Sequence, residues 1–80
     1  MSANKLFKNL GFVLIRSDDD YIIFEKELEQ GIKKVVSFCE QLQDVNISYE
    51  NMMGRQYPSI DMELFEAIQL KLLELGWISK

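Results

Sequence analysis

The sequence predicts an α+β domain: a four-stranded antiparallel meander flanked by a short N-terminal helix and a longer C-terminal helix, in the order αββββα. Four apolar or alternating runs, separated by turn-forming residues, are typical of consecutive strands. Apolar residues spaced by three and four indicate a helix at each end of the chain. The 80 residues, 48% hydrophobic and 28% charged, suffice for one globular domain over residues 1–80.

The opening helix is predicted over residues 3–10. Ser2 precedes it and suits an N-cap, because its hydroxyl can accept a backbone N–H of the first turn. Gly11 follows it, where glycine readily takes the left-handed conformation that ends many helices. A helix this short needs tertiary packing to persist.

The next run, "GFVLIR" over residues 11–16, is apolar on both of its alternating sets. Phe12 and Leu14 point to one side of the predicted strand, and Val13 and Ile15 point to the other. Two interpretations follow and stay open here. The strand is covered on both faces for part of its length, or its apolar residues form an interface.

Three further strands follow. "SDDD" at 17–20 forms a turn, so residues 21–28 complete a hairpin with the first strand. Residues 32–41 are predicted as the third strand because they are rich in β-branched residues, although the apolar spacing over 32–43 also fits a helix. Residues 45–50 alternate between apolar and polar, which is typical of a strand with one solvated face.

The closing helix begins at a predicted N-cap, Asp61, with Ile60 and Phe65 placed to form a hydrophobic staple. Gly76 ends it, and Trp77 is placed to fold back onto the last turn. With about 100° between successive residues, the predicted core face consists of Leu64, Phe65, Ile68, Leu72 and Leu75.

Leu70 and Leu73 fall outside that face, among acidic residues and near Met62 and Trp77. One interpretation is ordinary surface leucine, or burial by the N-terminal helix. The other is a partner-binding patch, which a helix-to-helix homodimer would bury in an isologous contact. Replacing both leucines with Glu is then expected to give a folded monomer.

The connection "NMMGRQYPS" over residues 51–59 is a second candidate for partner binding. Its side chains are of types enriched at protein interfaces and hot spots: Met52, Met53, Arg55 and Tyr57. The alternative is that the methionines fill the edge of the core and that the tyrosine covers it.

The charge balance disfavours nucleic acid as a partner. The formal net charge is −4, whereas phosphate binding usually requires a basic surface. The alternative is a nucleic-acid-associated regulator that uses a local lysine patch, for which Lys26, Lys33 and Lys34 form one candidate and Lys5 and Lys8 another. No segment approaches the ~18 consecutive apolar residues of a membrane span, and the N-terminal residues do not resemble a secretory signal.

The sequence has no histidine and one cysteine, Cys39, so it lacks the commonest general base and the ligands of a zinc site. We expect no cofactor and no enzymatic activity. A small metal-dependent enzyme using Asp18, Asp19 and Asp20 is the remaining alternative, but three adjacent acids without a surrounding ligand loop are more typical of a solvated turn.

The segments "LFKNLGF", "YIIFEKE" and "IDMELFEAIQLKLLELGWI" resemble small uncharacterised proteins encoded by phages and prophages of Gram-positive bacteria. The resemblance lies in the general layout and in the closing Leu75, Gly76 and Trp77. It implies an accessory protein in the cytoplasm of the host cell and brings no catalytic residues with it. Together with the residue-level reasoning, it predicts action by contact with an unidentified protein partner, or as a homodimer.

Overall fold

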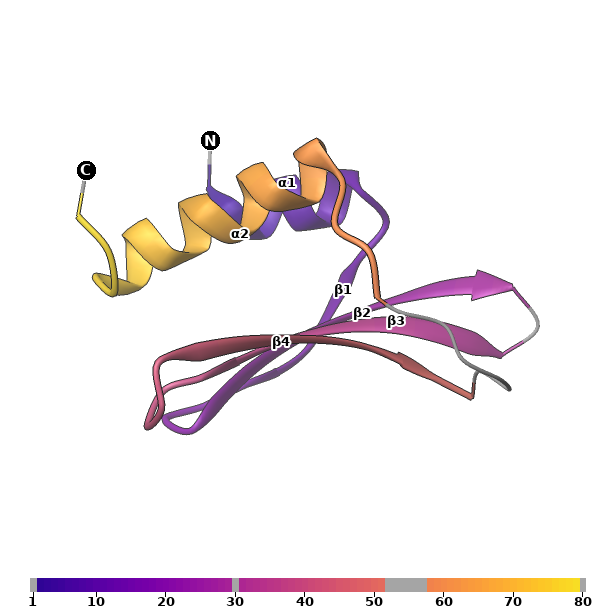
Figure 1. The fold of residues 1–80 in the computed structure, drawn as a ribbon, viewed down its shortest axis with the longest axis horizontal. Coiled ribbons are helices and arrows are strands. Elements are labelled where there is room, and N and C mark those ends of the chain that lie inside the picture. The colour runs from indigo at the N-terminus through magenta and orange to yellow at the C-terminus, as the bar shows by residue number, and fades with distance from the viewer. Residues whose placement is uncertain (1, 30, 52–57, 80) are drawn as a thin grey trace.

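The structure is a computed structural model that describes residues 2–29, 31–51 and 58–79. It confirms the predicted αββββα order (Figure 1). The elements are α1 (Ala3–Asn9), β1 (Val13–Ser17), β2 (Tyr21–Glu29), β3 (Ile32–Cys39), β4 (Asp44–Glu50) and α2 (Met62–Leu75). The strand interpretation of the third run is confirmed, and the helical alternative over 32–43 is wrong. The third strand ends at Cys39, two residues before the predicted end.

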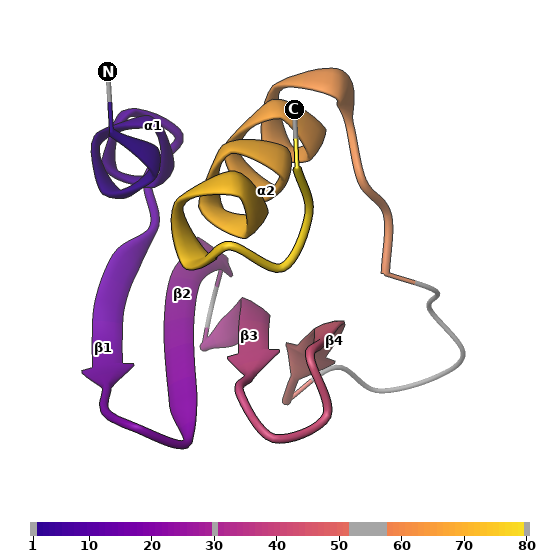
Figure 2. The ribbon, with the colours of Figure 1, turned by 90° about the vertical axis from the view of Figure 1, so that its left-hand side faces the viewer.

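The four strands form one antiparallel sheet in the order β1-β2-β3-β4. Both helices lie on the same face of this sheet, with α1 above β1 and α2 above the middle strands (Figure 2). The strands therefore alternate between side chains that meet the helices and side chains on the open face. Phe24, Val36 and Ile47 are successive cross-strand partners on the helix-covered face.

The core is built on phenylalanine rings from both layers. The Phe7 ring of α1 stacks on the Phe24 ring of β2, with ring centroids 4.0 Å apart. Phe12 and Phe38 meet Phe7 edge-on, at centroid distances of 5.6 and 6.2 Å. Aromatic pairs in these geometries stabilise a core beyond the area they bury. This cluster fixes α1 over β1 and β2.

Both helices end in the same hydrogen-bonded motif, as the sequence predicts. Gly11 and Gly76 take positive φ values of 95° and 77°. The Phe12 N–H donates to the Phe7 carbonyl at 2.9 Å, and the Trp77 N–H donates to the Leu72 carbonyl at 3.0 Å. This pattern is a Schellman motif, which turns the following aromatic residue back towards the helix.

The predicted N-caps are also confirmed. The Ser2 hydroxyl accepts the Lys5 N–H at 3.2 Å, and the Asp61 carboxylate accepts the Leu64 N–H at 2.8 Å. Each cap satisfies a backbone donor that has no partner within the helix.

One part of the predicted core face is wrong. Phe65 is 46% exposed, whereas α2 buries Leu64, Ala67, Ile68 and Lys71. The physical reason is α1, which packs alongside α2 and draws the buried face of α2 towards itself. Two hydrogen bonds mark this contact: Lys71 Nζ donates to Asn4 Oδ1 at 3.0 Å, and the Ala3 N–H donates to Glu74 Oε2 at 2.8 Å.

Candidate functional site

Three consecutive exposed aliphatic residues lie on β1, at one edge of the sheet, and a second exposed apolar group, Ile60, Met62 and Phe65, lies at the start of α2. All five residues of β1 are exposed, although the first three are aliphatic. The exposed fractions are 61% for Val13, 41% for Leu14 and 51% for Ile15. The interpretation of this run as a strand covered on both faces is wrong within the described chain, because Phe12 is buried in one alternating set but Val13 and Ile15, in the other, are exposed. The interface interpretation stays a prediction.

A bulge shapes this strand. Leu14 pairs with Phe24 and Arg16 pairs with Ile23, so Ile15 has no cross-strand partner in the register. An extra residue of this kind bends the strand and increases its twist. The backbone groups of β1 that point away from β2 have no strand beside them in the described sheet. Charged residues often protect exposed edges, yet this edge presents aliphatic side chains over most of its length.

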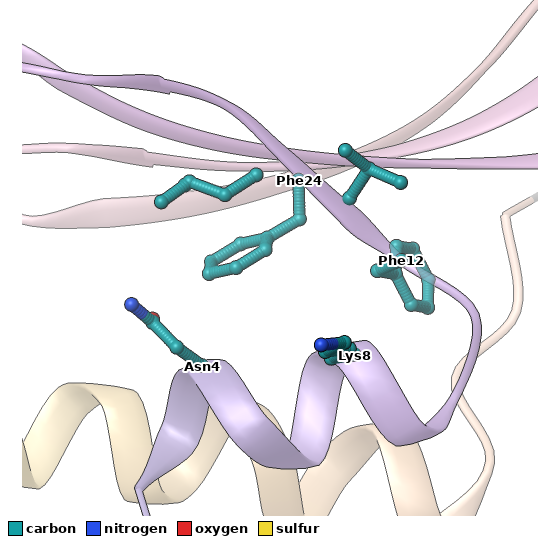
Figure 3. Close-up of a pocket in the computed structure, with 6 residues that line it drawn as sticks. Asn4, Lys8, Phe12 and Phe24 are labelled. Carbon is teal, nitrogen blue, oxygen red and sulfur yellow. The ribbon is translucent and has the colours of Figure 1, made fainter.

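A groove of about 290 Å³ runs between α1 and β1. Figure 3 shows its geometry: Phe12 and Phe24 approach it from the sheet side, while Asn4 and Lys8 extend from α1. Val13 and Leu14 complete the lining, so most of the wall is apolar. Its volume is at the lower limit of the range of about 300–1,000 Å³ found for small-molecule sites. It is large enough to receive an aliphatic side chain from a protein partner.

The acidic turn lies at the far end of β1 from α1 (Figure 2). Asp18 organises this turn: its Oδ1 accepts the N–H groups of Asp20 and Tyr21, each at 2.8 Å, and its Oδ2 accepts Arg16 Nε at 2.6 Å. The Arg16 side chain and the two backbone N–H groups lower the pKa of Asp18 to about 2. The predicted turn is confirmed for Asp18, Asp19 and Asp20, whereas Ser17 is the last residue of β1.

The two ends of β1 carry opposite charge. Lys5 and Lys8 are exposed on α1, which precedes the strand, and Asp19 and Asp20 are exposed in the turn that follows it. None of these four side chains forms an ion pair within the described residues. The candidate site, called the β1 surface below, consists of Val13, Leu14, Ile15 and the groove beside them, bounded by these two charged ends.

The predicted partner-binding residues are not brought together here. Met52, Met53, Arg55 and Tyr57 lie outside the described residues. Met62, at the start of α2, is 70% exposed. Leu70 and Leu73 are half-buried on α2. Residues next to them on the helix, Lys71 and Glu74, bond to α1, so this side of α2 is engaged within the chain.

Trp77 is half-buried and has a structural role. Its ring lies 6.3 Å from the Phe38 ring, centroid to centroid, and its Nε1 donates to Glu40 Oε2 at 3.3 Å. The residues that the prediction did not place in a site, Val13 to Ile15, were nevertheless visible in the sequence as an apolar run on both alternating sets. What the sequence did not reveal was that nothing in the described chain covers them.

The other chemical hypotheses gain no support from the geometry. Lys26 and Lys34 are cross-strand partners on the helix-covered face, whereas Lys33 lies on the open face, bonded to Glu25 at 3.0 Å. The predicted patch of Lys26, Lys33 and Lys34 is therefore divided between two faces, whereas Lys5 and Lys8 are both exposed on α1. Within the described residues, no three acidic, cysteine or histidine side chains are grouped as a metal site would require.

The comparisons add no functional information. Searches of family models, of curated proteins and of solved structures give no significant match to this chain. Among the described residues, neither α1 nor α2 has the length and apolarity that a membrane-crossing helix needs.

Proposed function

We propose that this protein acts without catalysis, by binding a protein partner through the β1 surface. The observation that carries the proposal is the exposure of three consecutive aliphatic residues on an edge strand. Contiguous apolar surface of this kind commonly marks an interaction site. An unpaired strand edge adds a row of backbone donors and acceptors that a partner segment can bind.

The groove beside β1 supports the same role. A partner side chain that enters this groove removes its apolar surface from water and packs against Phe12 and Phe24, as anchor residues do at protein interfaces. The opposite edge of the sheet differs. On β4, Val45, Ile47 and Tyr49 are half-buried towards the helices, while Asn46 and Ser48 occupy the open face. The β1 edge is therefore the better candidate for binding by apolar contact.

The cellular role is proposed from the resemblance of the closing segment and of the general layout to small phage and prophage proteins. On that basis, the protein is an accessory factor that acts in the cytoplasm of a host cell. Its acidic net charge of −4 is compatible with solubility and disfavours binding to the phosphate backbone of a nucleic acid.

The test is site-specific photocrosslinking in the cells that naturally produce the protein. A photoreactive amino acid replaces Val13, and in a matched control it replaces Leu42, which is 73% exposed in the turn between β3 and β4. Position 13 is expected to give a discrete adduct, identified by mass spectrometry, that position 42 does not give. Equal adduct patterns from both positions would contradict the proposal.

A further inference from the structure

We propose that the partner at the β1 surface is a second copy of this chain, with the two β1 strands antiparallel across a two-fold axis. The inference rests on the proposed function and names the partner. It derives from the position of the exposed aliphatic residues and from the charges at the two ends of the strand.

The apolar part of the surface suits contact with itself. In an isologous dimer the same patch meets its own copy, so the exposed aliphatic residues Val13, Leu14 and Ile15 of one chain are covered by those of the other. The groove between α1 and β1 then receives an aliphatic side chain from the second copy's strand. One contact therefore covers the strand edge and fills the groove.

The charges select the antiparallel orientation. The lysines of α1 lie at the start of β1, and the acidic turn lies at its far end (Figure 2). When two such strands run antiparallel, Lys5 and Lys8 of each chain face Asp19 and Asp20 of the other. A parallel arrangement would place lysine against lysine and aspartate against aspartate, which is unfavourable.

The aliphatic residues lie between the two charged ends. Val13, Leu14 and Ile15 follow α1 in the chain and precede the acidic turn. An antiparallel contact that pairs the charged ends therefore also brings the aliphatic segments of the two chains together.

The contact is small and is expected to be weak. Stable interfaces bury about 800 Å² on each partner, whereas this surface consists of one short strand and its groove. We expect a dissociation constant in the micromolar range, on the order of 10–100 μM.

The first experiment measures the mass of the full-length protein by sedimentation equilibrium, from about 5 μM to about 1 mM. The wild type is expected to change from monomer to dimer over this range. Val13→Lys is expected to stay monomeric, while the control Leu42→Lys, with the same change of charge at an exposed position, associates like the wild type. A wild type that is monomeric at the highest concentration would overturn the inference.

The second experiment tests the orientation by charge reversal. Lys8→Glu and Asp19→Lys are each expected to weaken the dimer about fivefold or more, because each change acts twice in a two-fold dimer. The two changes combined in one chain restore the pairing with reversed signs, so dimerisation is expected to recover. Failure of this recovery overturns the antiparallel arrangement.

The control for net charge is Glu66→Lys, on the exposed side of α2. It changes the net charge by the same amount as Asp19→Lys, from −4 towards −2. If overall repulsion governed association, both variants would tighten the dimer. The inference predicts that only Asp19→Lys weakens it. Circular dichroism verifies that each variant is folded.

The outcomes also separate this inference from the proposed function. A photocrosslinked adduct at position 13 with twice the mass of the chain supports both. An adduct of another mass, with a wild type that stays monomeric, retains the proposed function and overturns self-association. The absence of any specific adduct, with a monomeric wild type, overturns both.

Discussion

Replacing Phe7 with alanine tests the packing of α1 against the sheet most severely. Phe7 has no exposed surface, and its ring contacts Phe24, Phe12 and Phe38. Removing a fully buried phenylalanine ring costs about 3–5 kcal/mol, and the loss of three aromatic pairs places this case near the upper value. An 80-residue domain has a total stability of about 4–12 kcal/mol, so Phe7→Ala is expected to lose a third or more of it.

The assay is urea denaturation followed by Trp77 fluorescence and circular dichroism. Phe7→Leu, which keeps part of the volume, is expected to cost about 1–3 kcal/mol and stays measurable if the alanine variant unfolds. The matched control is Phe65→Ala on α2, where the ring is 46% exposed and the expected cost is below about 1.5 kcal/mol. Equal losses for Phe7→Ala and Phe65→Ala would refute the observed orientation of α2.

Three further changes probe local interactions. Gly76→Ala is expected to cost about 1–2 kcal/mol in urea denaturation because φ is 77°, although the added Cβ meets open space. The Asp18 carboxyl is expected to titrate by NMR with a midpoint near its pKa of about 2, and Arg16→Ala is expected to raise this midpoint. Because the pKa is lowered in the folded state, the contribution of Asp18 to stability is complete above about pH 4 and is lost as the pH falls through 2. Asn4→Ala is expected to cost about 1–3 kcal/mol because it removes the acceptor of the buried Lys71 ammonium, and to cost less in a Lys71→Met background.

The fold could be predicted from the sequence because its signals are local. Turn residues, alternation and caps each act within a few residues, so the order of elements and both glycine-terminated helices were predictable. The third strand was ambiguous because its apolar spacing fits both periods, and pairing with β2 and β4 decides between them.

The orientation of α2 could not be predicted in the same way. It depends on α1, a separate segment that lies alongside α2 and forms hydrogen bonds with Lys71 and Glu74. A lysine is rarely assigned to a buried face from sequence, since its burial requires a specific acceptor such as Asn4. The sequence predicts Phe65 in the core because hydrophobicity and helical periodicity take no account of α1.

The candidate site has a sequence signal that local patterns alone cannot resolve. An apolar run on both alternating sets predicts either double coverage or an interface. The position of β1 at the sheet edge argues against double coverage, and the interface stays a prediction. Helical periodicity separates Leu70 and Leu73 from the predicted core face of α2, so the sequence alone indicates a patch there. In the structure Leu70 and Leu73 are half-buried, whereas Val13 to Ile15 are more exposed.

The most direct measurement is an isotope-filtered NOESY spectrum of a mixture of labelled and unlabelled protein at about 1 mM, well above the expected dissociation constant. Pairing of β1 across a two-fold axis predicts intermolecular contacts among the methyl groups of Val13, Leu14 and Ile15, and none from α2. Intermolecular contacts from Leu70 and Leu73 alone, or none from any methyl group, would contradict it.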